Sequence, residues 1–146
     1  MEKEKMNQAE RNAEGHAESI IELYRAYTAL ENGAESARAD GCEFTSSDRV
    51  LESATESALD VSVRADWHNP GKSAEPDEFM ILLTTGGPAL RIIGDLDRGC
   101  PENPHFEIQD WGTPWTEYHP NAESEDDWED AIDWFVSCFY YVFFGE

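Results

Sequence analysis

Residues 78–96 read EFMILLTTGGPALRIIGDL and decide the fold. Two runs rich in apolar residues, 78–84 and 90–96, flank a Gly-Gly-Pro sequence at positions 86–88 that is typical of a tight turn. Two apolar runs of strand length that are joined by such a turn predict a β-hairpin. The glycines are interpreted as turn residues rather than as a phosphate-binding loop, because GxGxxG and GKS/T patterns are absent and a strand follows them.

Further strands are predicted on both sides of this hairpin. Residues 59–67 alternate apolar and polar side chains, which predicts a half-buried strand that ends before the Asn-Pro-Gly break at 69–71. Residues 106–111 predict another strand after a loop at 97–104. The sequence therefore predicts an α+β fold with a three- or four-stranded antiparallel sheet meander, two N-terminal helices and one C-terminal helix.

The helices are indicated by apolar residues at three- and four-residue spacing. The first helix is predicted to begin at His16 and to end near Asn-Gly at 32–33, and the second to begin after two N-cap serines at 46–47. The last helix is predicted to run from the N-cap Ser124 to about Phe143. One face of this last helix is apolar and the other is an acidic stripe.

The composition predicts a single domain with an excess of negative charge. The chain has 146 residues, of which 40% are hydrophobic, enough for one core. Residues 1–15 lack apolar periodicity and are predicted to be a flexible polar leader, which leaves residues 16–146 as one acidic α+β domain. The formal net charge of −22 far exceeds the magnitude of about 2 to 8 that keeps a small domain soluble. A basic partner, a salty habitat or dimerisation is expected to offset the resulting self-repulsion.

The acid excess is concentrated in residues 99–146, which hold twelve carboxylates and no Lys or Arg. The same segment is rich in Trp, Tyr and Phe, so it is predicted to be folded, with its charge on a surface. A rigid surface of one sign repels nucleic acid and attracts the basic grooves that bind it. Salt adaptation, the alternative, predicts acids spread over the whole chain, whereas residues 1–98 carry 20 acids and all 10 bases.

Two predicted helices present acids at i, i+4 spacing. Residues four apart on a helix rise about 6 Å, close to two phosphate steps of about 3.4 Å along a DNA strand. The alternative is a solvated helix face whose N-terminal acids interact with the helix dipole. The acidic residues predicted to bind a partner are Asp48, Glu52, Glu56, Asp126, Asp127, Glu129, Asp130 and Asp133.

Residues 109–118 form the densest cluster of aromatic and turn residues outside a clear helix or strand. Large aromatic side chains on loops are frequent binding anchors, which makes this segment a candidate partner-binding loop. Its candidate contact residues are Asp110, Trp111, Trp115 and Tyr118. The alternative interpretation is structural, with the tryptophans capping the core while Gly112 and Pro114 form a turn.

No residue pattern predicts a metal site, a cofactor or a catalytic centre. His68, His105 and His119 are isolated, and HxxxH, HExxH and CxxC patterns are absent. Residues 95–97 begin like a calcium loop, but Arg98 follows and no acid closes the loop. GxSxG is absent, and the many carboxylates give no basis for choosing an acid and base pair. The chain is therefore expected not to be an enzyme.

The cysteines and the hydropathy pattern predict a reduced, cytoplasmic setting. The three cysteines form an odd set without CxxC spacing, and no signal peptide is recognisable. The apolar run at 135–144 is too short to cross a bilayer.

Distinctive strings occur from Ala58 onward, among them LDVSVR at 59–64, TGGPALRIIG at 85–94, QDWGTPW at 109–115 and FGE at 144–146. In these strings the chain resembles a largely uncharacterised family of small acidic proteins encoded by bacteriophages and conjugative plasmids. The resemblance implies a host-takeover or counter-defence context, such as that of an anti-CRISPR or anti-restriction protein, and assigns no role to any residue. The acidic segment 123–130 and the more acidic N-terminal half depart from the family and favour a specialised role.

The leading hypothesis is a counter-defence inhibitor that binds a basic nucleic-acid-binding surface of a host nuclease complex by acidic, nucleic-acid-like mimicry. The expected partner is a basic protein of the host cytoplasm, such as a CRISPR effector or a restriction nuclease, and direct binding to nucleic acid or membrane is not expected. A homodimer is compatible with an exposed sheet edge or aromatic patch. The alternative is a protein–protein interaction module that uses the loop at 111–118, with the acidity serving solubility or salt adaptation.

Overall fold

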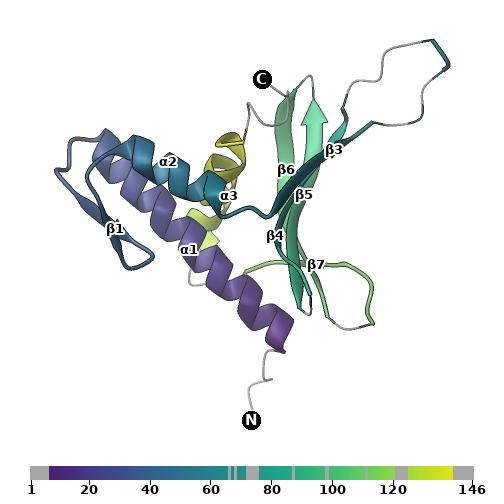
Figure 1. The fold of residues 1–146 in the computed structure, drawn as a ribbon, viewed down its shortest axis with the longest axis horizontal. Helices are drawn as coiled ribbons and strands as arrows, with labels where there is room; N and C mark the ends of the chain where they lie inside the picture. Colours follow the sequence, from purple (N-terminus) through teal and green to yellow (C-terminus); the bar gives the residue numbers. More distant parts are fainter. Residues whose placement is uncertain are drawn as a thin grey trace.

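The computed structural model describes residues 7–65, 67, 69–71, 76–86, 88–97, 99–110, 112–120 and 125–139. Within them the chain forms three helices, a two-stranded sheet and a five-stranded sheet. All strand pairs are antiparallel, which confirms the predicted α+β class. Figure 1 shows the helices gathered on one side of the larger sheet.

The five strands of the larger sheet follow one another in sequence order. They are β3 (Asp60–Arg64), β4 (Glu78–Thr84), β5 (Ala89–Asp97), β6 (Cys100–Gln109) and β7 (Thr116–Tyr118). The predicted central hairpin is confirmed as β4 and β5, with Ile81 opposite Ile92. The sheet is therefore a meander in which β3 and β7 are the two edge strands.

The predicted number of three or four strands is corrected to five. Strand β6 begins at Cys100 and includes most of the predicted loop at 97–104, while β7 lies inside the predicted aromatic loop. The prolines Pro101 and Pro104 favoured a loop in the sequence, but β7 pairs only with residues 106–108 of β6. Proline costs no ladder hydrogen bond on an open strand edge, so β6 can contain both.

A second, smaller hairpin between the first two helices was not predicted. Strands β1 (Ala37–Ala39) and β2 (Cys42–Phe44) are joined at Asp40 and Gly41, which have φ angles of 53° and 76°. Asp-Gly with two positive φ angles is a favoured two-residue hairpin turn, so the sequence did carry a signal. The Asp40 amide donates to the Glu22 carboxylate at 2.8 Å, which fastens this hairpin to the first helix.

Helix α1 (Gln8–Glu31) begins at Gln8 and not at His16, so the predicted flexible leader is helical from Gln8 onward. Residues 1–6 lie outside the described residues. A capping box starts the helix, with the Asn7 side chain accepting from the Glu10 amide at 2.8 Å and the Glu10 carboxylate accepting from the Asn7 amide at 3.0 Å. The buried residues of its first turns are alanines, which a search for large apolar residues misses: Ala9, Ala13 and Ala17.

Helices α2 (Ser47–Glu56) and α3 (Glu125–Ser137) both pack on α1. The predicted N-cap of α2 is confirmed, since the Ser46 hydroxyl accepts from the Asp48 amide at 3.2 Å. Helix α3 ends at Ser137 and not near Phe143, because a tighter turn follows in which the Phe139 amide donates to the Val136 carbonyl at 3.0 Å. The predicted N-cap Ser124 and the chain beyond Phe139 lie outside the described residues.

One face of the five-stranded sheet forms the floor of the core. Buried and partly exposed residues alternate along β4, and the alternation continues on β5 and β6. The buried side chains of these strands are Phe79, Ile81, Leu83, Leu90, Ile92, Leu96, Phe106 and Ile108. Helices α1 and α3 lie on this inner face in Figure 1, and no described helix covers the outer face.

Gly94 is the point at which the sheet permits no side chain. A Cβ atom at this position would lie 2.7 Å from the Phe79 ring and 2.8 Å from the Glu102 carbonyl oxygen. We expect Gly94→Ala to lower the free energy of unfolding by about 1–3 kcal/mol, the usual cost of overpacking a core. Urea denaturation followed by tryptophan fluorescence measures this loss.

The matched control is Gly15→Ala in α1, where a Cβ would meet no atom within 4 Å. Alanine is favoured over glycine inside a helix by about 0.8–1.0 kcal/mol, so this variant is expected to gain stability. A Gly94→Ala variant as stable as the parent chain would contradict the close packing of β4, β5 and β6.

Candidate functional site

Helix α3 carries the predicted acidic stripe on the side that faces water. Glu129, Asp130 and Asp133 are exposed, whereas Trp128 and Ile132 are buried among the core residues. The burial pattern thus confirms an amphipathic helix. Within the described part of the chain, none of the three exposed carboxylates has a hydrogen-bond or ion-pair partner. We name Glu129, Asp130 and Asp133 the α3 acidic face.

The carboxylates of the α3 acidic face repel one another. Partial burial raises the pKa of Asp133 above its usual value, and the neighbouring charges of Asp130 and Glu129 raise this pKa further. A cation close to Asp133 would lower its pKa instead. Burial is the larger cause of the shift, while the absence of an ion-pair partner in the described chain shows that the three carboxylates are not compensated there.

A groove borders the α3 acidic face on the side of the sheet. Two adjoining hollows of about 390 and 450 Å³ lie between α3 and the strands β6 and β7, and they share Asn103, Pro104 and Asp133. Their acidic lining residues are Glu102, Glu117, Glu129 and Asp133. The described lining residues include no Lys or Arg. We name this feature, defined by its four carboxylates, the acidic groove.

The open edge of β6 forms one wall of the acidic groove. Strand β7 covers only residues 106–108, so residues 101–104 face the groove without a neighbouring strand on that side. Pro101 and Pro104 have no amide hydrogen to donate, and Asn103 has a φ angle of 53°. These features prevent the regular pairing of another strand with this edge. The groove therefore suits side chains of a partner better than an added strand.

Glu102 and Glu117 were not among the predicted site residues. They lie on β6 and β7, distant in sequence from α3, and meet it only because β6 runs beside that helix. The sequence signal that could have found them is the lack of Lys and Arg throughout residues 99–146.

Asp127, another predicted contact residue, is already paired inside the protein. Its carboxylate accepts from the Arg25 guanidinium of α1, with the Nε atom at 3.0 Å. This ion pair fixes α3 to α1 and leaves Asp127 less available to a partner. The side chain of Asp126 lies outside the described residues.

The acids of α2 belong to a separate helix. Asp48, Glu52 and Glu56 are exposed as predicted, but Glu52 lies 3.6 Å from the Arg49 guanidinium. The groove is built by α3 and the sheet, without any residue of α2 in its described lining.

The predicted aromatic loop contains a turn and a short strand. Asp110 and Thr113 close the turn, since the Thr113 amide donates to the Asp110 carbonyl at 3.1 Å, and Gly112 has a φ angle of 72°. Trp115 is half-buried, with its ring centroid 4.1 Å from the Arg91 guanidinium carbon, a cation–π contact on the outer face of the sheet. Trp111 lies outside the described residues.

Tyr118 points inward and ties the sheet to α1. Its hydroxyl donates a hydrogen bond to the Glu14 carboxylate, across the contact between β7 and α1. Burial, this hydrogen bond and the Glu14 charge raise the pKa of Tyr118 far above its ordinary value. The placement supports a structural role for this residue, in line with the alternative interpretation of the loop.

We expect Tyr118→Phe to lower the free energy of unfolding by about 1 kcal/mol, since it removes a hydrogen bond to a partly buried carboxylate. The control is Tyr27→Phe, because the Tyr27 hydroxyl makes no hydrogen bond within the described residues. Chemical denaturation at neutral pH compares the two variants. An equal loss of unfolding free energy in both variants would contradict the structural role assigned to the Tyr118 hydroxyl.

We expect Asp133→Asn to stabilise the free protein. Burial and the charges of Asp130 and Glu129 raise the folded-state pKa of Asp133 above its ordinary value, so the charged form destabilises the folded state at neutral pH. Exposed charge interactions amount to about 0.2–1 kcal/mol, so the thermal midpoint should rise by roughly 1–2 °C at low salt. The gain should vanish as the pH falls below about 3, where both states bind the proton.

The control for net charge is Asp48→Asn, which removes one negative charge from the first turn of α2. There the helix dipole stabilises an acid. Thermal unfolding followed by circular dichroism, at neutral pH and below about pH 3, compares the two variants. A gain in Asp48→Asn equal to that in Asp133→Asn would show that net charge, not crowding on α3, is responsible.

Among the described residues, no group of three or more His, Cys, Asp or Glu side chains is placed to hold a metal ion. A helix long and apolar enough to span a membrane is likewise not found in the described part of the chain. No family model, no curated protein and no solved structure matches the chain.

Proposed function

We propose that the protein is a counter-defence inhibitor that binds the basic nucleic-acid-binding surface of a host nuclease complex, as an anti-CRISPR or anti-restriction protein does. In this proposal the α3 acidic face and the acidic groove take the place of nucleic acid. Inhibition is stoichiometric and requires no chemical turnover by the protein.

The observation that carries the proposal is the uncompensated charge on α3. Three neighbouring carboxylates repel one another there, and the groove beside them adds Glu102 and Glu117 without any Lys or Arg in its described lining. A partner that brings Arg or Lys side chains relieves this repulsion, so part of the binding free energy is stored in the free protein. Such a surface favours partners whose own sites are strongly basic.

The scaffold holds these charges in fixed positions. Helix α3 is anchored by Trp128, Ile132 and Phe135, and the Trp128 ring packs edge-on against Phe106 of the sheet with a centroid distance of 4.9 Å. A preorganised surface loses little conformational entropy on binding. Glu129 and Asp133 are separated by one helical turn, a rise of about 6 Å that resembles the spacing between alternate phosphates.

No arginine or lysine is among the described lining residues of the acidic groove. Arg25, Arg49, Arg64 and Arg91 each form an ion pair with an acid of this chain. With a formal net charge of −22, the protein repels nucleic acid and favours a basic protein instead. The resemblance to small acidic phage and plasmid proteins supports a counter-defence context for such binding.

The aromatic loop is the less supported candidate surface. Trp115 stacks on Arg91, and the Tyr118 hydroxyl binds Glu14, so both side chains already have partners inside the protein. An interaction module centred on this loop would have to rearrange these contacts. The proposal therefore places the binding surface on α3.

The test is DNA cleavage by purified CRISPR effectors and restriction nucleases, titrated with the protein. We expect one such enzyme to be inhibited at about equimolar protein, with DNA binding blocked in a gel-shift competition. Replacing Glu129, Asp130 and Asp133 by Lys is expected to raise the inhibitory concentration at least about tenfold, since charges at an interface centre contribute most.

The matched control replaces Asp48, Glu52 and Glu56 by Lys on α2, which changes the net charge equally. This control and Trp115→Ala are expected to keep most of the inhibition. The proposal fails if the α2 variant loses as much inhibition as the α3 variant, or if Trp115→Ala alone abolishes it.

A further inference from the structure

The edge strand β3 is open for pairing. The Arg64 carbonyl accepts from the Asp77 amide beside β4 at 2.9 Å, so the backbone of Arg64 faces β4. Because backbone directions alternate along a strand, the amides of Val61 and Val63 point away from β4. The register between β3 and β4 is continuous, and β3 contains no proline. This edge therefore lacks the features that protect the open edge of β6.

The exposed large apolar side chains of the described chain lie on or next to this edge. Leu59, Val63 and Trp67 are its exposed large hydrophobic residues, with exposed fractions of 60%, 40% and 102%. Val63 lies on the same face as Val61, because side chains two residues apart on a strand share a face, and Leu59 and Trp67 lie just outside the two ends of β3. An exposed apolar row along an open strand edge is typical of a surface that pairs with another strand.

The sequence of β3 is complementary in charge to itself. The strand reads Asp60-Val61-Ser62-Val63-Arg64. If two copies pair antiparallel about Ser62, Asp60 of one copy lies opposite Arg64 of the other, and the two valines lie opposite each other. Opposite charges that face each other across an antiparallel pair stabilise it, whereas like charges destabilise it. In this register the outward amides of Val61 and Val63 are placed to donate to the carbonyls of Val63 and Val61 of the other copy.

We propose that β3 pairs with β3 of a second copy of this chain, so that two five-stranded sheets form one continuous sheet. The pairing places Val63 and Leu59 of each copy against the exposed apolar side chains at β3 of the other copy. It is an isologous contact with two-fold symmetry, which closes at the dimer.

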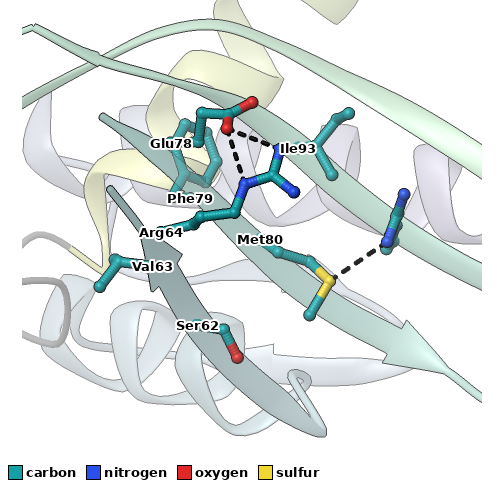
Figure 2. Close-up of a pocket in the computed structure, with 8 residues that line it drawn as sticks. Ser62, Val63, Arg64, Glu78, Phe79, Met80 and Ile93 are labelled. Carbon is teal, nitrogen blue, oxygen red and sulfur yellow. Dashed lines mark hydrogen bonds and ion pairs between the residues drawn. The ribbon is translucent and has the colours of Figure 1, made fainter. Parts of the chain in front are cut away.

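The charged side chains of β3 are already held on the outer face. Figure 2 shows Arg64 lying on Glu78, with Nε to Oε1 at 2.8 Å, beside a hollow of about 250 Å³ that also contacts Ser62, Met80 and Ile93. Arg64 has donors left for a second carboxylate, since a guanidinium carries five. Asp60 accepts from the Ser62 hydroxyl at 3.0 Å and is thereby oriented on the same face.

Dimerisation at β3 leaves the acidic groove open. β3 is one edge of the sheet, while the groove lies at β6 and β7, at the other edge. The two grooves therefore lie at opposite ends of the joined sheet, where repulsion between the copies is weakest. Strand β3 itself carries one acid, Asp60, and one base, Arg64, so it brings no net charge of its own to the contact.

Analytical ultracentrifugation at about 0.15 M salt, where screening acts beyond about 8 Å, tests the proposal. The parent chain is expected to sediment as a dimer, at twice its mass of 16.5 kDa, at raised protein concentration. Asp60→Arg and Arg64→Asp each place like charges opposite one another and are expected to weaken dimerisation at least about tenfold.

Mixing the two single variants is the decisive step. One chain then carries two arginines at positions 60 and 64 and the other carries two aspartates, so the charges match again and a heterodimer is expected. Its recovery also shows that both variants are folded. A monomeric parent chain, a dimer unaffected by both substitutions, or a mixture that stays monomeric would overturn the proposal.

Discussion

In the described chain, the inner face of the five-stranded sheet is buried where α1 and α3 pack against it, and the position of the α3 acidic face depends on this contact. The small side chains Ala9, Ala13 and Ala17 allow α1 to lie close to the strands. Helix α3 closes the other part of the face through aromatic packing, in which Trp128 meets Phe106. Burial of each large apolar side chain contributes about 1.5–3 kcal/mol, and together these contacts fix the direction in which the acids of α3 point.

This core has to hold together a chain with a formal net charge of −22. Charge of one sign destabilises a compact state by self-repulsion, and screening by salt reduces the effect. Three of the four described ion pairs join separate parts of the fold: Arg25 joins α1 to α3, Arg64 joins β3 to β4, and Arg91 joins β5 to β6. The α3 acidic face has no such ion pair within the described residues. Binding sites commonly lower the stability of the free protein, and contacts with the partner then offset this loss in the complex.

Local signals in the sequence predicted the local structure well. The hairpin at 78–96 and the N-cap Ser46 follow from turn and cap chemistry, and both are present. The start of α1 was missed because its buried face is made of alanine, although Asn7 and Glu10 form a capping box. The full length of β6 does not follow from the sequence, because Pro101 and Pro104 are as typical of a loop as of an open strand edge. The acidic groove could not be predicted, since it depends on the order of the strands, which brings Glu102 and Glu117 to α3.

The central claim is that the α3 acidic face binds a basic surface through its charge. The most direct measurement is the dissociation constant of the inhibitor–nuclease complex at a series of salt concentrations, for the parent chain and for the chain with Lys at positions 129, 130 and 133. The account predicts that binding of the parent chain weakens steeply as salt rises and that the slope is much shallower for the variant, because fewer charge contacts are screened. A dissociation constant that does not change with salt, or an equal slope for both chains, would contradict it.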